Sequence, residues 1–434
     1  MKEIEQEYKN KTSNSEKLFS EAINIFPGGI CHPLRYFHPY PFYIKRAKGS
    51  KIWDVDNNQY TDYWMGHYSL IFGHSYPPII KHLKNEMENG TQWGIVNSLQ
   101  IRLAEKIINN IKSAEMGKFA NTGMEANTYA IRLARAYTKN KIVLKAEGGW
   151  HGFTSDLMYG INPNFNNVET EGLLESEFGY TKTIPFNDIE GTEKILNQTK
   201  EIACIIIEPV LGSAGFIPAK KEYLKFLSEE SKKRGYILIF DEIITGFRLG
   251  LGGAQEYYNV YPDITVLGKI LGGGLPIGAL FGNKEIMKLS DIKNNVVKIG
   301  GGTFSCNPLT MSSGLKTLDI LENNKQIYSE LNSIGDKFRV KVNSELNDIN
   351  KKCIATGISS LFQLHYLNKE NQNISNAKQK ESLDDKKKSE ELFLRLVIKG
   401  FYLPRLHGAI SYSHKQEENT ELINNITEIA ANIK

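Results

Sequence analysis

A single lysine stands in an apolar, glycine-rich stretch of the sequence. Lys269 follows the apolar run Ile264–Leu267 and precedes three consecutive glycines, 272–274. Burial among apolar groups disfavours a charged amine, so it lowers the lysine pKa and makes the nitrogen nucleophilic. Most lysines are surface charges, but apolar flanks on both sides favour a reactive amine, one able to form a Schiff base.

A carboxylate ends another apolar run. Asp241 closes the segment Tyr236–Asp241, whose other residues are apolar. A buried carboxylate requires a cationic or hydrogen-bonding partner. A protonated pyridine nitrogen would serve, and so would a metal ion. No second acidic cluster or histidine pair lies near it, and the four cysteines form no CxxC pair. The sequence therefore predicts no metal site.

A glycine-containing turn precedes an expected helix that runs to Tyr137. Thr122 and Glu125 have the spacing of a capping box, and Gly123 between them lets the backbone approach a ligand closely. The free N–H groups and the positive dipole end of a helix N-terminus suit a phosphate group. A purely structural helix cap is the alternative explanation of this segment.

Two further segments follow expected strands. Trp150 and His151 come after a pair of glycines, a pattern that suggests a flat ligand stacked on an aromatic ring. Glu208 comes directly after the apolar run 202–207, where a carboxylate can bond at the edge of a site. A turn around a core tryptophan and a glutamate that anchors a loop are the structural alternatives.

These residue types together match the needs of one cofactor. Pyridoxal 5′-phosphate (PLP) requires a lysine for its aldehyde, a carboxylate for its ring nitrogen and a cradle for its phosphate. Lys269, Asp241 and the turn at Gly123 supply these parts. PLP bound in this way acts as an electron sink, and the released lysine moves a proton between substrate and cofactor. The sequence thus predicts a PLP enzyme.

The elements that position these residues alternate between strands and helices. Short apolar, β-rich runs are separated by helical segments such as Tyr223–Arg234, which is typical of a mainly parallel sheet covered by helices on both faces. Ligands of such sheets bind at the carboxyl ends of the strands. The expected strands are Lys141–Lys145, Ile202–Glu208, Tyr236–Asp241 and Ile264–Leu267.

The flanking segments differ in pattern and predict a second, smaller domain. Residues 2–26 predict one helix, Phe42–Tyr63 predicts short antiparallel strands, and the final helix is expected from about Thr420. The predicted domains are residues 66–312, a large PLP-binding α/β domain, and residues 1–65 with 313–434, which contribute to a small α+β domain.

Composition excludes several classes of protein. Of the 434 residues, 41% are hydrophobic and 24% are charged, which is ordinary for a globular protein. A net charge of +4, spread along the chain, gives no basic stripe, so no nucleic acid partner is expected. There is no basic-then-apolar leader and no apolar run of about 18 residues, so neither a signal peptide nor a membrane span is expected. Scattered cysteines fit a reducing cytoplasm.

The sequence resembles the class III aminotransferases of PLP fold type I from about Phe26 to its C-terminus. Within that family it is similar to the glutamate-1-semialdehyde 2,1-aminomutase branch. The resemblance implies PLP-dependent amino-group transfer on a small amino or keto acid. It is carried by these motifs, in this order: FPGG with the later Arg35, GSKIWDVDNNQYTDY, GMEANTYAIRLARAY, EGGWHGF, IIIEPVLGSAGF, DEIITGFR, LGKILGGGLPIGAL and GGTFSCNPLTMSSG.

The resemblance implies roles around the cofactor ring. Lys269 matches the Schiff-base lysine, and Asp241 matches the partner of the pyridine nitrogen. Ile243 matches the aliphatic residue on one ring face, and Trp150 stands where the family has tyrosine or phenylalanine on the other. Glu208 matches the glutamate near the 3′-oxygen. Thr122, His151 and Gly302 lie within or beside the matching motifs and complete the predicted set of cofactor-binding residues.

Further implied roles concern the phosphate, the partner subunit and the substrate. Gly123 and Met124 match the phosphate-binding turn. Thr303, which follows Gly302, matches the residue that reaches the phosphate of the neighbouring subunit, so a homodimer with shared active sites is implied. Arg35 matches an arginine that binds the substrate carboxylate, with bidentate geometry.

Departures from the aminomutase pattern lie at the expected substrate pocket. Residues 66–69 replace Ser-Trp-Gly-Pro and include His67, a further candidate for substrate binding. The segment Leu403–Ile410 has no glutamate where the aminomutases have Ser-x-Phe-Glu, His32 replaces a small polar residue, and Met124 lacks the usual hydroxyl. These differences favour the alternative of an intermolecular transaminase for a β-amino acid or ω-amine, with a keto acid acceptor.

Two other classes of function are disfavoured. A nucleotide-binding enzyme would carry its lysine after the glycines, as in GxxxxGK[ST], whereas Lys269 precedes them. A regulator without catalysis would not need both Lys269 and Asp241. Between aminomutase and transaminase, a lid that traps the intermediate would favour the aminomutase, and the polar segment Asn162–Tyr180 is long enough to form one.

Overall fold

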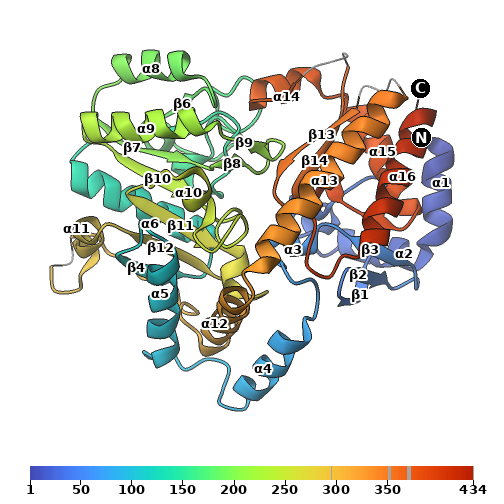
Figure 1. Cartoon of the computed structure of the whole chain (residues 1–434), viewed down its shortest axis with the longest axis horizontal. Coiled ribbons are helices and arrows are strands. Elements are labelled where there is room, and N and C mark those ends of the chain that lie inside the picture. The colour runs from blue at the N-terminus through green and yellow to red at the C-terminus, as the bar shows by residue number, and fades with distance from the viewer. Residues whose placement is uncertain (295, 350–352, 369–372, 434) are drawn as a thin grey trace. The chain divides into compact units, whose positions relative to one another are not determined.

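The chain folds into two compact units (Figure 1). The computed structural model describes residues 1–294, 296–349, 353–368 and 373–433. The larger unit comprises residues 78–329 and 373–382, and the smaller unit comprises residues 1–77, 330–372 and 383–434. Both ends of the chain therefore belong to the smaller unit.

A seven-stranded sheet forms the centre of the larger unit. Its strand order is β4-β12-β11-β10-β7-β5-β6, with β12 antiparallel to both neighbours and the other pairings parallel. This mainly parallel arrangement confirms the predicted α/β architecture. The strands are β4 (Met116–Ala120), β5 (Ile142–Ala146), β6 (Thr181–Ile184), β7 (Ile202–Ile207), β10 (Ile237–Asp241), β11 (Ile264–Gly268) and β12 (Gly278–Gly282), with β8 (Val210–Leu211) and β9 (Ile217–Pro218) in a separate pair.

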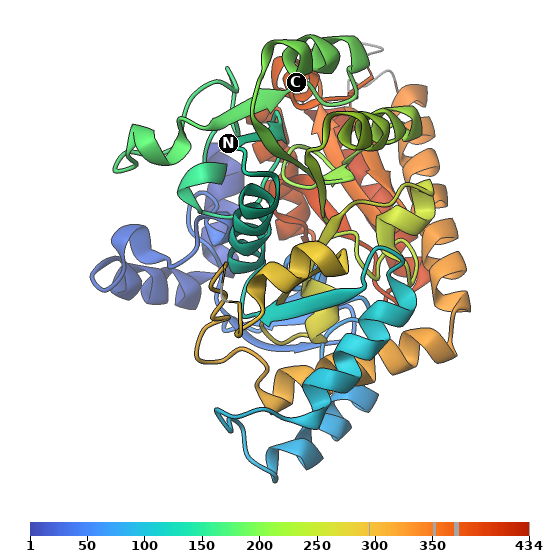
Figure 2. The same cartoon turned by 90° about the vertical axis from the view of Figure 1, so that its left-hand side faces the viewer.

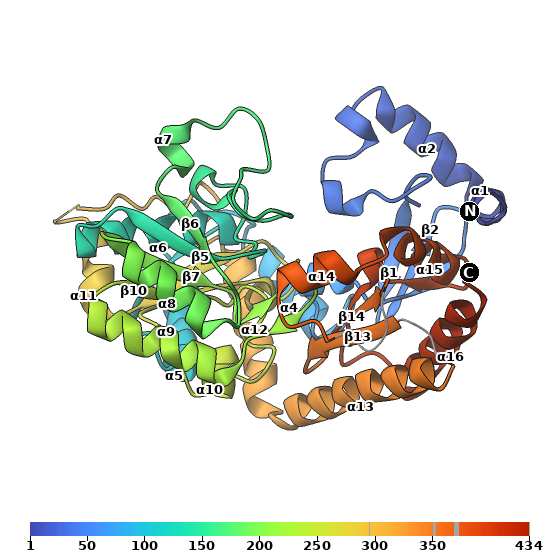
Figure 3. The ribbon, with the colours of Figure 1, turned by 90° about the horizontal axis from the view of Figure 1, so that it is seen from above.

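Helices cover both faces of this sheet. Helices α6 and α9 lie on opposite sides of it (Figures 1 and 3), and α5 packs against α12 (Figure 2). Every residue of β7 and β10 is buried, as expected for strands covered on both faces. The helices of this unit are α4 (Pro77–Met87), α5 (Ser98–Asn110), α6 (Gly123–Thr138), α7 (Glu175–Phe178), α8 (Ile189–Gln198), α9 (Lys221–Arg234), α10 (Gly253–Tyr258), α11 (Lys284–Met287), α12 (Pro308–Asn323) and α14 (Ala377–Leu383).

The smaller unit combines two small sheets with long helices, as the predicted α+β domain requires. Strands β1 (Ile44–Lys48), β2 (Lys51–Asp54), β3 (Gln59–Asp62) and β15 (Phe401–Tyr402) form one sheet. Strands β13 (Cys353–Ile358), β14 (Leu361–Tyr366) and β16 (His407–Ala409) form the other. Its helices are α1 (Lys2–Lys11), α2 (Ser13–Ile23), α3 (Met65–Tyr68), α13 (Gln326–Asp348), α15 (Lys386–Ile398) and α16 (Gln416–Asn432).

Several local predictions were wrong. The predicted helix 2–26 is two helices, α1 and α2, because Thr12 has φ −129° and ψ 37°, outside the helical region. The last helix begins at Gln416 rather than near Thr420. Its start is capped by Glu418 Oε2, which accepts a hydrogen bond from the Lys415 N–H at 2.8 Å. Strands β4, β6 and β12 were not predicted. β12 reads GALFG, and glycine has little strand propensity.

The unit boundaries follow packing rather than the change in sequence pattern. The larger unit begins at residue 78 instead of 66, since α3 packs against β16 of the smaller unit. Its main segment ends at residue 329 instead of 312, since α12 packs against α5. Within the described residues, no helix is both long enough and apolar enough to cross a membrane.

Candidate active site

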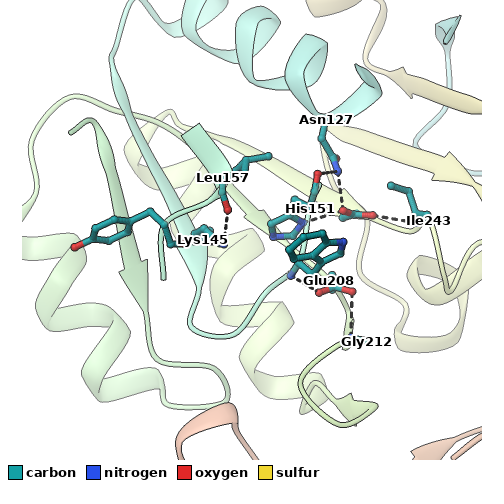
Figure 4. Close-up of polar contacts among 10 residues, drawn as sticks. Asn127, Lys145, His151, Leu157, Glu208, Gly212 and Ile243 are labelled. Carbon is teal, nitrogen blue, oxygen red and sulfur yellow. Dashed lines mark hydrogen bonds and ion pairs between the residues drawn. The ribbon is translucent and has the colours of Figure 1, made fainter. Parts of the chain in front are cut away.

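Asp241 is the centre of a buried hydrogen-bond network in the larger unit, and its partners Asn127, His151 and Ile243 are labelled in Figure 4. It ends strand β10 and is 4% exposed. Its Oδ2 accepts from Asn127 Nδ2 at 2.9 Å and lies 2.8 Å from His151 Nδ1. Its Oδ1 accepts from the backbone N–H of Ile243 at 3.1 Å. These contacts fix the orientation of the carboxylate at the carboxyl end of the sheet, where sequence analysis expects the ligand.

His151 is a buried neutral ring beside this carboxylate. Burial lowers the pKa of His151, and the opposing effect of Asp241 does not reverse that direction. A neutral imidazole that donates to a carboxylate oxygen carries its proton on the facing nitrogen, so Nδ1 donates to Asp241. Its Nε2 is buried without a hydrogen-bond partner among the described residues. A buried nitrogen of this kind marks a position where a bound molecule can supply a partner.

Glu208 holds the turn that carries Trp150. Its Oε1 accepts from the Trp150 N–H at 2.8 Å, and its Oε2 accepts from the Gly212 N–H at 3.1 Å. Burial, reinforced by the nearby Asp241 carboxylate, raises the pKa of Glu208 to about 8. The turn is thus tied to two neighbouring strands, to β7 through Glu208 and to β10 through Asp241.

Lys269 lies immediately after β11 and has a left-handed backbone conformation. Its φ is 46°, a region that a side chain larger than glycine rarely adopts and that recurs at functional sites. Burial lowers the pKa of Lys269, and the carboxylates of Asp241 and Glu208 oppose that shift. The structure therefore brings the predicted lysine and both predicted carboxylates into one electrostatic environment.

The predicted capping box is present at the start of α6. Thr122 Oγ1 accepts from the Glu125 N–H at 3.2 Å, and Glu125 Oε2 accepts from the Thr122 N–H at 3.2 Å. A Cβ on residue 123 would lie 2.2 Å from Ile243 Cδ1, so a larger residue at this position would displace the Ile243 side chain. The start of α6 at Gly123 therefore lies close to Ile243, two residues after Asp241 at the end of β10.

The loop with Gly302 and Thr303 lies beside this helix start. Asn121 Nδ2 donates to the Gly301 carbonyl at 3.0 Å, and a Cβ on Gly302 would lie 2.4 Å from Asn121 Nδ2. Thr303 is exposed, and its carbonyl accepts from Gln92 Nε2 at 2.8 Å. The predicted phosphate turn and the predicted intersubunit residue therefore occur in adjoining loops of one unit. Met124 is also exposed, by 37%.

The predicted substrate residues belong to the smaller unit. The rings of His32 and His67 are 5.1 Å apart, and the His67 ring is 4.3 Å from that of Trp64. Arg35 is exposed at the end of a short 3-10 turn. Burial lowers the pKa of His32, and the charges of Arg35 and Arg405 lower it further. This unit therefore places two arginines near one histidine.

Residues 65–68 form a left-handed turn that carries His67. Their φ angles are 46°, 58°, 58° and 69°, and only residue 66 is glycine. Each non-glycine residue in this conformation costs roughly 1–2 kcal/mol. Asp62 compensates, because its carboxylate accepts from the N–H groups of residues 64 and 65 at 2.7 and 3.2 Å and pairs with His74 Nε2 at 2.6 Å. The turn is thus strained but anchored.

Sequence analysis did not identify three residues of these networks. Asn127 lies inside a quoted motif, but only the helix places it one turn from Gly123 and against Asp241. Arg405 stood in the segment noted for its missing glutamate. Lys145 ends the predicted strand Lys141–Lys145, and a charge inside a buried strand was the available signal.

Residues 35–360 match the family described as Aminotransferase class-III. The chain belongs to the class-III aminotransferases. It is 38% identical over 420 residues to the glutamate-1-semialdehyde 2,1-aminomutase of Methanosphaera stadtmanae, covering 96% of this chain and 98% of that relative. The aminotransferase is therefore an enzyme of PLP-dependent amino-group transfer, and small amino or keto acids fit the family as substrates.

Solved structures agree with this assignment. An omega-transaminase from Sphaerobacter thermophilus has a TM-score of 0.89 at 30% identity, with 96% of this chain and 97% of that chain covered. A structure described as a transaminase with PLP bound has a TM-score of 0.88 at 28% identity, with 96% and 97% covered. The fold is PLP fold type I, and PLP is the cofactor.

The residues around Asp241 fit this cofactor. A carboxylate accepts about four hydrogen bonds, and the structure gives Asp241 three, which leaves capacity for a protonated ring nitrogen. The orphaned His151 Nε2 provides a second unsatisfied polar atom beside it. The close backbone approach at Gly123 and the free N–H groups of a helix start suit a phosphate.

Proposed function

We propose that PLP binds in the larger unit, with Lys269 as its covalent attachment point and Asp241 as the partner of its ring nitrogen. The observation that supports this most is the buried Asp241 carboxylate, fixed by three donors and sharing its electrostatic environment with Lys269. When bound, PLP supplies an electron sink for the substrate carbon that carries the amine. Asp241 keeps the ring nitrogen protonated, because a buried anion needs a cationic partner.

The remaining residues of the larger unit hold the cofactor in place. In this proposal Ile243 and Trp150 contact the two faces of the ring, and His151 orients Asp241 from behind. Glu208 lies at the 3′-oxygen side and fixes Trp150 through its backbone N–H. The turn formed by Thr122, Gly123 and Met124, with Gly302, receives the phosphate. Lys269 then serves as the proton carrier, since burial lowers the pKa of its amine and favours the uncharged form that accepts a proton.

We propose a cytoplasmic homodimer in which Thr303 reaches the phosphate of the neighbouring subunit. Two hydrogen bonds, from Gln92 Nε2 to Thr303 and from Asn97 Nδ2 to Cys306, hold residues 92–97 beside residues 303–306. Both segments expose large apolar side chains, a feature of protein interfaces. These side chains are Trp93, Ile95, Val96 and Phe304, exposed by 41%, 72%, 80% and 62%. Sedimentation of the purified protein as a 49.1 kDa monomer would contradict this part of the proposal.

Arg35 and His67 are the proposed substrate-binding residues of the smaller unit. A guanidinium binds a carboxylate through two parallel hydrogen bonds, so Arg35 suits an amino acid substrate. The preferred reaction is the intramolecular transfer that interconverts glutamate-1-semialdehyde and 5-aminolevulinate, supported by full-length similarity to the aminomutases. It needs no second keto acid.

One observation favours the alternative, an intermolecular transaminase. Arg405 is a second cation near His32, within the segment that lacks the glutamate of the aminomutases. A second arginine suits a keto acid acceptor that carries an additional carboxylate. The structural similarity to an omega-transaminase is consistent with this alternative.

One assay separates the two reactions. Purified protein carrying PLP is mixed with glutamate-1-semialdehyde in the absence of any keto acid, and 5-aminolevulinate is measured against a control without enzyme. Catalytic formation of 5-aminolevulinate supports the aminomutase. No formation, together with conversion of the bound cofactor to its amine form by other amino acids, supports the transaminase. A protein that binds no PLP would overturn both.

A further inference from the structure

A buried lysine beside the site has no place in the proposed chemistry. Lys145 lies in β5, between β7 and β6, and none of its surface is exposed. Its Nζ donates to the carbonyl oxygens of Leu157 at 2.9 Å and Tyr159 at 2.8 Å (Figure 4). No carboxylate of the described residues lies within 4.0 Å of this amine, so backbone carbonyls are its direct partners.

The carbonyls that Lys145 binds belong to a segment that supports the turn at residues 147–152. Directly after Tyr159, the carbonyl of Gly160 accepts from the Gly148 N–H at 2.9 Å. Gly148 is left-handed, with φ 77°, and a Cβ on it would lie 2.5 Å from the Cβ of Ala377. A hydrogen-bonded path therefore leads from Lys145, through residues 159–160, to the backbone of the turn.

That turn presents two residues assigned to the cofactor. Its Trp150 N–H is held by Glu208, and its His151 ring is held by Asp241. These two contacts hold the far end of the turn, together with Asn127 Nδ2, which donates to the His151 carbonyl at 3.0 Å. The near end is held by the Gly148 contact and by the Glu147 N–H, which donates to the Ile184 carbonyl at 3.0 Å. Displacement of residues 157–160 would remove the Gly148 contact, loosen the near end and change the angle at which Trp150 and His151 are presented.

A lysine is a costly way to fill this position. Burying an amine requires compensation by hydrogen bonds, and a methionine would fill similar space without that cost. Burial lowers the pKa of Lys145 to about 7, opposed by the carboxylates of Glu208 and Glu169, and the lysine charge in turn lowers the pKa of His151. The side chain thus affects the site through its backbone contacts and through its charge.

We propose that Lys145 is a positioning residue, whose amine ties residues 157–159 to β5 and thereby sets the turn that carries Trp150 and His151. Its contribution to catalysis rests on the proposed function, but its contribution to the turn does not. It touches neither the reacting atoms nor the cofactor in this proposal. Removal of the amine should therefore loosen residues 147–160 locally, without a general loss of stability of the protein.

Hydrogen exchange measured by mass spectrometry tests this on the purified protein, before and after addition of PLP. Lys145→Met is compared with Lys182→Met, a matched control, since Lys182 is the exposed register partner of Leu144 on the adjacent strand β6. In Lys145→Met, amides of residues 147–160 should exchange roughly tenfold faster or more, while peptides of β7 and β10 stay unchanged. Lys182→Met should leave both regions unchanged.

A second measurement addresses catalysis. Lys145→Met should lower kcat by roughly tenfold with little change in KM and should alter the visible circular dichroism of bound PLP, because the cofactor contacts are misplaced rather than lost. If Lys145→Met does not fold, Lys145→Gln, which retains one donor group, replaces it with the same expected pattern at smaller amplitude. Unchanged exchange at residues 147–160, or faster exchange by one common factor throughout the protein, overturns the proposal. Local loosening in a protein that binds no PLP would support the positioning role and refute the proposed function.

Discussion

Two turns of this chain follow the end of a strand and carry a histidine, yet they are stabilised differently. The turn at residues 147–152 follows β5, and its left-handed positions, 148 and 152, are glycines. The turn at residues 65–68 follows β3 and places a methionine, a histidine and a tyrosine in left-handed conformation. The backbone of the first turn is relaxed. The second turn stores strain, which the Asp62 carboxylate and backbone hydrogen bonds such as Tyr68 N–H to the Trp64 carbonyl at 2.9 Å oppose.

The difference suits the different tasks proposed for the two turns. A cofactor that stays bound requires a surface that is the same in every turnover, and buried hydrogen bonds to Asp241 and Glu208 provide it. A substrate group must be recognised in each turnover, and strained backbone at such sites holds a side chain where relaxed backbone would not. The comparison therefore distinguishes a cofactor turn with relaxed backbone, held by Asp241 and Glu208, from a substrate turn with strained backbone, held by Asp62.

The largest expected effect concerns the larger unit alone. Lys269→Ala should remove the covalent attachment of PLP and lower amino-group transfer by about a thousandfold or more, because both the attachment point and the proton carrier are lost. The measurement is the mass of the protein after PLP addition and borohydride reduction. Lys182→Ala is the control and should retain the mass increase. A mass increase that persists in Lys269→Ala would refute the assignment of this lysine.

The anchor of the strained turn gives the next effect. Asp62→Ala removes the acceptor of two backbone N–H groups and the partner of His74, which should cost about 3 kcal/mol of stability. Because the strained turn then loses its side-chain anchor, KM should rise while binding of PLP is retained. Urea unfolding and PLP titration are the measurements. Asp62→Asn, which keeps one acceptor oxygen, should be intermediate. Equal loss of PLP binding and of substrate binding would contradict the separation of the two turns.

The sequence indicates the conformation of the turn at residues 147–152 more clearly than that of the turn at residues 65–68, and the reason is physical. Glycines at 148 and 152 and a carboxylate at the end of an apolar run are visible as residue types. A left-handed methionine or tyrosine is not, because these residue types rarely adopt that conformation and the residue types alone do not show that Asp62 accepts from the N–H groups of Trp64 and Met65. Asn127 and Lys145 were missed for the related reason that their partners lie on other elements. Strand β12 was missed because glycine does not favour a strand. Its glycines allow α6 to pack closely against it, which the sequence alone does not show.

Substrate recognition gives a smaller effect than loss of the lysine. Arg35→Ala should raise KM for substrates that carry a carboxylate by roughly tenfold to a hundredfold, since it removes charge-assisted hydrogen bonds worth about 1.5–3 kcal/mol. Simple amines without a carboxylate should be affected little. Steady-state kinetics with a matched pair, an amino acid and its decarboxylated amine, provides the measurement. An equal rise for both would mean that Arg35 has a structural role.

The buried histidine of the cofactor turn predicts a dependence of stability on pH. Burial lowers the pKa of His151 in the folded protein below its value in the unfolded chain, so the unfolded chain binds more protons in acid. The contribution of neutral, buried His151 to the free energy of unfolding is therefore fully present above a pH of about 6.5, and it is lost as the pH falls below that value. Urea unfolding of the wild type and of His151→Gln at several pH values measures this. Identical slopes in the two proteins would show that His151 does not titrate on unfolding.

The smallest effect tests the strain directly, through one glycine in each turn. Gly66→Ala should cost about 1–2 kcal/mol, the usual cost of a larger residue in left-handed backbone, because the new Cβ would meet no backbone atom and only approach Ser69 Oγ at 3.1 Å. Gly148→Ala should cost distinctly more, because its Cβ would lie 2.5 Å from the Ala377 Cβ, which has no side-chain rotation to relieve the contact. Urea unfolding of both variants gives the comparison. If Gly66→Ala cost as much as Gly148→Ala, the substrate turn would depend on the freedom of its glycine, and Asp62 would not be its main anchor.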